Sequence, residues 1–86
     1  MEFEDDELEP FPLDGLIVPL IALTSGGPPK IEIKVGEKPY RYDRSYPIKG
    51  HSAVLPSYLR QQLSAGKQPL LLERSDRFYL YFALTS

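Results

Sequence analysis

Residues 30–42 read KIEIKVGEKPYRY and contain the clearest folding signal in the chain. Apolar and polar side chains alternate on both sides of Gly36 and Glu37, which is the pattern of two half-buried strands. A two-residue loop with glycine in its first central position favours a type II′ hairpin. The predicted cross-strand pairs on one face are Val35 with Lys38, Ile33 with Tyr40, and Ile31 with Tyr42.

Pro39 bears on the position of this hairpin in the sheet. It would face Lys34 at a non-hydrogen-bonded pair, so its missing N–H would point away from the partner strand. We therefore expect residues 38–42 to lie at an edge of the sheet.

A further strand is expected on the N-terminal side of the hairpin. Residues 15–24 are rich in β-branched and leucyl side chains and are followed by the turn sequence SGGPP. Both alternating sets are apolar, so the strand should be covered on both faces or twist across a barrel corner. Pro19 cannot donate to a ladder, and a bulge or an edge is expected there.

A short helix is expected on the C-terminal side of the hairpin. Pro56 suits a first helical position, and Gly66 suits the position just after the last turn. Leu55, Leu59 and Leu63 would form the stripe that docks on the sheet.

Two final strands are expected over residues 69–73 and 77–84. In the last strand the even-numbered residues Phe78, Leu80, Phe82 and Leu84 are assigned to the core. This assignment leaves Tyr79 and Tyr81 as an exposed aromatic patch. The whole order predicts an α+β fold with one short helix, built on a small, mostly antiparallel sheet or a partly closed barrel of OB-like element order.

The charge distribution divides the chain. Residues 1–14 hold seven of the twelve acidic residues and no Lys or Arg, while residues 15–86 hold all ten basic residues. Pro10 and Pro12 discourage a helix in the first part. We therefore expect residues 1–14 to form a flexible acidic arm and residues 15–86 to form a single domain. The arm could be a solubilising tail, dock on a basic partner, or fold back on the protein's own basic face.

Several classes of function are disfavoured by the sequence. Without cysteine, the chain has no thiol nucleophile, disulfide or thiolate metal ligand, and His51 is expected to be a surface or capping residue. No catalytic motif is recognisable, so we expect no enzyme, no cofactor and no metal. The apolar run of residues 16–23 is too short to span a bilayer. The acidic start lacks the basic residues of a secretory signal, which favours the cytoplasm.

The residues after the predicted hairpin turn give the main candidate site. Residues 38–51 interleave Lys and Arg with three tyrosines, a mixture found at protein interfaces and on single-stranded nucleic-acid binders. An ordinary solvated edge with core tyrosines would give the same pattern. The candidate contact residues are Arg41, Tyr42, Arg44, Tyr46 and Lys49 in the body, with Phe3, Leu8 and Phe11 in the arm.

These features favour a non-enzymatic interaction module, such as a small accessory subunit or regulator. It would bind a protein partner through a basic, tyrosine-bearing edge strand and the acidic arm, and the edge strand could also pair two copies. The alternative is a small OB-like single-stranded nucleic-acid binder that its acidic arm regulates.

Overall fold

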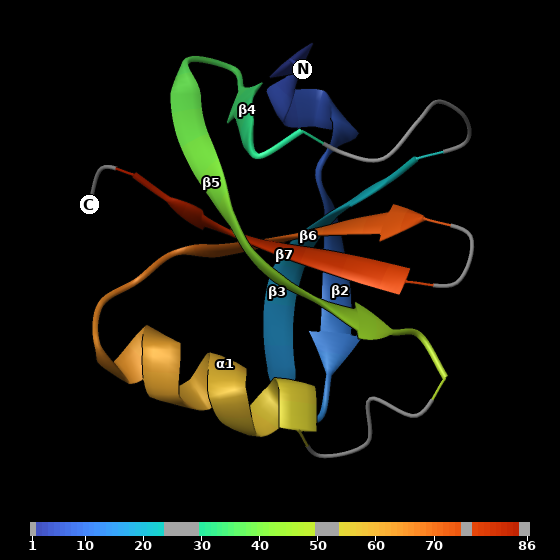
Figure 1. Cartoon of the computed structure of the whole chain (residues 1–86), viewed down its shortest axis with the longest axis vertical. Coiled ribbons are helices and arrows are strands. Elements are labelled where there is room, and N and C mark those ends of the chain that lie inside the picture. Colours follow the sequence, from blue (N-terminus) through green and yellow to red (C-terminus); the bar gives the residue numbers. More distant parts are fainter. Residues whose placement is uncertain (1, 24–29, 50–53, 75–76, 85–86) are drawn as a thin grey trace.

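The computed structural model describes residues 2–23, 30–49, 54–74 and 77–84 (Figure 1). Over these residues the strands form one seven-stranded sheet, in the order β1-β4-β5-β7-β6-β3-β2. The elements are β1 (Glu2–Phe3), η1 (Asp5–Glu7), β2 (Glu9–Leu13), β3 (Leu16–Ala22), β4 (Glu32–Val35), β5 (Lys38–Pro47), α1 (Val54–Ser64), β6 (Pro69–Arg74) and β7 (Arg77–Ala83).

The α+β class is confirmed. The sheet is mixed and curls into a half-barrel with one α-helix packed against it. Its β1–β4 and β3–β6 pairs are parallel, and the other four neighbouring pairs are antiparallel. The predicted element order is found from β3 onward, and β1, η1 and β2 precede it.

Two hydrophobic cores lie on opposite faces of the central strands. Along β6, Leu71 belongs to one core, whereas Leu70 and Leu72 belong to the other. Helix α1 covers the first, which we call the helix-side core, and buries Leu55 and Leu59 in it. The β4–β5 hairpin covers the second, which we call the hairpin-side core. Figure 1 shows α1 and the hairpin turn at opposite ends of the molecule.

Strand β5 contributes to both cores because a β-bulge interrupts it. The pairing of β5 with β7 shifts between Tyr42 and Arg44, so that Asp43 is the extra residue. An extra residue reverses the alternation of side chains between the faces of the sheet. Before the bulge Tyr40 is buried in the hairpin-side core, and after it Tyr46 is buried in the helix-side core.

The hairpin has the predicted register. Val35 pairs with Lys38 and Ile33 with Tyr40, and the N–H of Tyr42 donates to the carbonyl of Ile31 at 2.7 Å. Gly36 has a φ of 61°. The φ of Glu37 is not positive. A type II′ turn requires a positive φ at its first central residue only, so the two residues fit the predicted turn.

The predicted edge position of residues 38–42 is wrong, because β5 lies between β4 and β7. Pro39 is tolerated there since the register of β5 with β7 begins only at Tyr40. The carbonyl of Pro39 still accepts a hydrogen bond from the N–H of Leu84 at 3.0 Å.

Residues 2–14 lie within the sheet, whereas the sequence suggested an arm outside the domain. Asp14 and Gly15 have φ values of 50° and 84° and join β2 to β3 in a tight hairpin, as expected of a type I′ turn. Leu13 is buried in the helix-side core, and Phe11 packs against the same core. The acidic side chains of the segment all stay exposed, so burying its apolar residues desolvates no charge.

Prolines occupy the non-hydrogen-bonded pairs of the β2–β3 hairpin. Leu13 and Leu16, beside the turn, form a hydrogen-bonded pair, and the two kinds of pair alternate from there. Pro12 facing Ile17 and Pro10 facing Pro19 are therefore both non-hydrogen-bonded pairs. The expected bulge or edge at Pro19 is wrong, because β3 is interior and its register with β2 is regular. The pairing of β3 with β6 begins at Leu20, so Pro19 removes no ladder bond there.

Helix α1 ends as predicted. Gly66 has a φ of 84° and donates its N–H to the carbonyl of Leu63, while the N–H of Lys67 donates to the carbonyl of Gln62, each at 3.0 Å. These two bonds form a Schellman motif. The predicted apolar stripe holds for Leu55 and Leu59, but Leu63 is 40% exposed.

The two final strands are present, but the predicted choice of core face in β7 is only half right. Phe78 and Leu80 are buried as expected, whereas Leu84 is 49% exposed. Tyr81 is fully buried in the hairpin-side core, and its hydroxyl donates to the carbonyl of Lys30. Both faces of β7 are covered because the sheet curls around two cores. No helix among the described residues has the length and apolar character needed to cross a bilayer.

Candidate functional site

Basic and aromatic side chains from three elements meet beside α1, on the helix-covered face of the sheet. We call this group the basic-aromatic surface; its members are Arg41, Asp43 and Arg44 of β5, Tyr58 of α1, Lys67 just after α1, and Phe82 of β7. The pairing of β5 with β7 sets Arg41 opposite Phe82. The bulge then brings Arg44 to the same face, although it is three positions further along.

Arg44 is held in place by two neighbours. Its Nε donates to Oδ2 of Asp43 at 2.9 Å, and its guanidinium stacks on the ring of Tyr58 at 4.1 Å from the centroid. The hydroxyl of Tyr58 donates to the same Oδ2 at 2.7 Å. These contacts tie α1 to the bulge of β5 and leave Arg44 with a carboxylate already beside it.

The pKa shifts agree with this arrangement. Burial would lower the pKa of Arg44, but the hydrogen bond and negative charge of Asp43 outweigh it and raise the pKa. Burial and then the hydrogen bond to Asp43 raise the pKa of Tyr58. Arg44 is therefore a charged residue with a structural contact, and Tyr58 keeps its proton.

Arg41 differs from Arg44. It is exposed, and no hydrogen bond or ion pair joins it to another side chain in the part of the chain that the structure describes. Lys67 lies nearby, with Nζ 5.6 Å from the ring centroid of Phe82. The ring of Phe82 in turn meets that of Tyr58 edge-on at 6.3 Å.

A shallow hollow of about 250 Å³ adjoins these two cations. Its lining residues are Arg41, Tyr42, Asp43, Lys67, Phe82, Ala83 and Leu84. A guanidinium and an ammonium group beside an apolar wall can bind a carboxylate or phosphate that has an apolar neighbour.

The structure brings only some of the predicted contact residues together. Arg41 and Arg44 share the basic-aromatic surface, and Lys49 is exposed beyond the end of β5. The ring of Tyr42 lies over the hairpin-side core, 6.3 Å from that of Tyr79. Tyr46 is buried in the helix-side core with 8% of its surface exposed, so it offers little surface to a partner.

The apolar residues predicted as anchors of an arm pack on the protein itself. Phe3 and Leu8 lie against the hairpin-side core, and Phe11 lies against the helix-side core. The ring centroid of Phe11 is 5.4 Å from that of Phe78. These side chains are partly buried against the cores, so they do not project from the protein as an arm would present them.

Three members of the surface were missed at the level of sequence: Tyr58, Lys67 and Phe82. Tyr58 lies on the helix face predicted to dock, and Phe82 was assigned to the core, so only the pairing of β5 with β7 reveals that they meet Arg41 and Arg44. His51 lies outside the described residues. Within those residues, no group of three or more His, Asp or Glu side chains could hold a metal ion.

Comparison with protein-family models, curated proteins and solved structures found no match to this chain.

Proposed function

We propose that this protein is a non-enzymatic interaction module, a small accessory subunit or regulator, that binds an acidic segment of a protein partner through its basic-aromatic surface. The observation that carries the proposal is the contrast between its two arginines. The guanidinium of Arg44 already pairs with Asp43 and stacks on Tyr58, whereas Arg41 is exposed beside Lys67 and an apolar hollow. A fixed surface with a free cation suits a partner carboxylate, and Arg is enriched at interface hot spots.

The proposed contact uses side chains and not an edge strand. β5 is interior, so its backbone has neighbours on both sides. The strands of the acidic segment, β1 and β2, are paired within the sheet, and the segment is not part of the proposed contact. We keep the cytoplasm as the proposed compartment.

Single-stranded nucleic-acid binding by an OB-like fold is the second candidate. Cations interleaved with Tyr58 and Phe82 favour it. However, Arg44 lies over the ring of Tyr58 and Lys67 over that of Phe82, so these rings are poorly placed to stack bases. Residues 2–14 also form β1, η1 and β2, and both strands pair within the sheet, which disfavours an arm that competes for the basic face. We therefore prefer a protein partner.

Charge reversal tests the preferred function. Quantitative pulldown from a native extract should compare the wild type with Arg41→Glu/Lys67→Glu, and with Lys30→Glu as an exposed charge-reversal control. We expect the double variant to lower recovery of the specific partner by about tenfold or more, because it replaces attraction by repulsion at the contact. Lys30→Glu should recover it normally.

Unchanged recovery by the double variant would reject this surface. The nucleic-acid candidate is tested in parallel by titrating mixed single-stranded oligonucleotides at low and moderate salt. Salt-sensitive binding that the double variant loses would favour nucleic acid over a protein partner.

A further inference from the structure

The two edges of the sheet differ in their capacity to pair with another strand. At the β2 edge, Pro10 and Pro12 occupy positions whose backbone nitrogens point outward, and proline has no N–H to offer there. At the opposite edge, the described residues of β1 pair with Lys34 and Val35 of β4. The β4 strand therefore continues past β1 at Glu32 and Ile33.

The backbone of Glu32 is oriented for pairing. Glu32 faces Arg41 at a non-hydrogen-bonded pair of the β4–β5 hairpin, because the pair before it, Ile33 with Tyr40, is hydrogen-bonded. Its N–H and C=O consequently point away from β5. Among the described residues, no backbone hydrogen bond outside the strand ladders uses either group.

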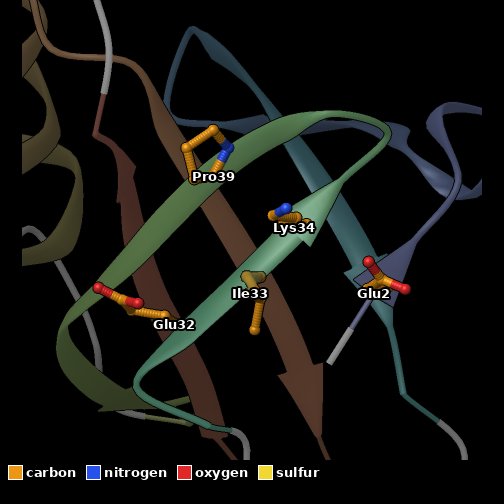
Figure 2. A pocket seen from close by; sticks show the side chains of 5 residues that line it. All are labelled: Glu2, Glu32, Ile33, Lys34 and Pro39. Atoms are coloured by element: carbon orange, nitrogen blue, oxygen red, sulfur yellow. The ribbon is translucent and has the colours of Figure 1, made fainter.

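A hollow of about 440 Å³ lies at this part of the edge (Figure 2). Its lining residues are Glu2, Glu32, Ile33, Lys34 and Pro39. Figure 2 shows Lys34 between the two glutamates, with Glu2 coming from β1. In the described part of the chain, neither glutamate forms an ion pair. The hollow thus offers two carboxylates that form no ion pair among the described residues, with Lys34 between them and Arg41 opposite Glu32, beside an open backbone.

The surroundings of the hollow add negative charge. The exposed acidic residues of η1 pack beside the hairpin turn, where a Cβ on Gly36 would lie 3.0 Å from the carboxylate oxygens of Asp5. Of the nearby lysines, Lys38 is hydrogen-bonded to Gln68 on the far side of the hairpin. The exposed carboxylates of β1, η1 and Glu32 outnumber the neighbouring cations of Lys30, Lys34 and Arg41, so an incoming segment meets a net acidic environment at this edge.

We propose that the open part of β4 is a strand-addition site for a basic, extended segment of a partner protein. The main chain of the segment pairs with Glu32, and its alternate Lys or Arg side chains lie against Glu2 and Glu32. In strand addition, main-chain hydrogen bonds provide affinity and the side-chain pockets provide specificity. This site is distinct from the basic-aromatic surface and does not depend on the function proposed for that surface.

The test is selection from a displayed library of nine-residue peptides, in which β-branched residues alternate with randomised positions. The key variant is Glu32→Pro, which removes the outward N–H without removing a bond of the β4–β5 ladder, as native Pro39 does on the facing strand. Glu32→Gln is the matched control, because it removes the charge and keeps the N–H. Lys67→Glu serves as a control for the other surface.

We expect the wild type to select peptides rich in Lys and Arg. Glu32→Pro should weaken their binding by at least fivefold, Glu32→Gln by less, and Lys67→Glu should not weaken it. Absence of selection, or equal binding to the wild type and to folded Glu32→Pro protein, would overturn the proposal.

A second measurement does not depend on the folding of the proline variant. N-methylation of one alternating set of peptide amides should abolish binding to the wild type, whereas methylation of the other set should be tolerated. Equal tolerance of both sets would also reject strand addition.

Discussion

Two arginines three positions apart in β5 differ in availability because of the residue between them. Asp43 is the extra residue of the bulge, and its carboxylate binds both Arg44 and the hydroxyl of Tyr58. Arg41 precedes the bulge and lies opposite Glu32, but no ion pair joins it to another of the described side chains. Sequence position alone gives the two residues the same charge, and only the local geometry separates the anchored cation from the available one.

Tyr81 should make stability depend on alkaline pH. Burial, followed by the neighbouring phenols of Tyr42 and Tyr79, raises its pKa to about 12, above the ordinary value of 10.0. Its contribution is therefore fully present below pH 10 and is lost as the pH rises through 12. The loss amounts to roughly 3 kcal/mol in the free energy of unfolding.

Urea denaturation of the wild type and Tyr81→Phe between pH 9 and pH 12 checks this prediction. At neutral pH the variant should lose about 1 kcal/mol with the hydrogen bond to Lys30. Its stability should then fall less steeply, although Tyr40 and Tyr58, whose pKa values are also raised, still contribute. Parallel pH profiles for the two proteins would contradict the assignment.

At the scale of elements, the N-terminal segment should be required for folding. Deleting residues 2–13 removes β1, η1 and β2, and takes Leu13 and Phe11 from the helix-side core. Large-to-small changes at single buried residues already cost about 2–5 kcal/mol. We expect the truncated chain to lose its cooperative thermal transition, measured by circular dichroism.

Charge removal in the same segment is the control for this truncation. Asp6→Asn/Glu9→Gln removes the charge of two exposed carboxylates. Each substitution should change the free energy of unfolding by no more than about 0.5 kcal/mol relative to the wild type. A truncated chain that melts like the wild type would show instead that residues 2–13 act as an independent arm.

Local patterns predicted the elements that depend on near neighbours. The register of residues 30–42, the Schellman end of α1 and the two C-terminal strands all follow from alternation or from a glycine at a defined position. The N-terminal hairpin also had a local signal, since Asp14-Gly15 lies between Leu13 and Leu16. The acidic composition around it suggested a boundary at the very turn that joins β2 to β3.

Features that depend on distant pairing could not be read from the sequence. The interior position of β5 and the burial of Tyr81 both depend on β7 pairing with β5 and β6. The bulge at Asp43 reverses which of the later residues of β5 face each core, so uninterrupted alternation could not place Tyr46 correctly. Arg41 and Arg44 were recognisable as candidates from the sequence alone. Their neighbours Tyr58, Lys67 and Phe82 were not, because they come close to the arginines only through the tertiary fold.

At the scale of the whole molecule, the two cores should unfold together. They lie back to back on β6 and β7, so neither can open while these strands stay fully packed. Leu59→Ala in the helix-side core should cost about 2–4 kcal/mol, and Ile33→Val in the hairpin-side core about 1 kcal/mol. Both variants should give a single denaturation transition that coincides by circular dichroism and tyrosine fluorescence. Separate transitions for the two probes would show that the cores are independent.

The outward-facing prolines of β2 have a consequence for assembly. A sheet that grows into a fibre must receive a strand on one side and present a template on the other. Here Pro10 and Pro12 interrupt the template, because two successive outward positions carry no donor. A copy that joins a sheet through its other edge would therefore terminate it, so pairing at β4 should give complexes of defined stoichiometry and not polymers.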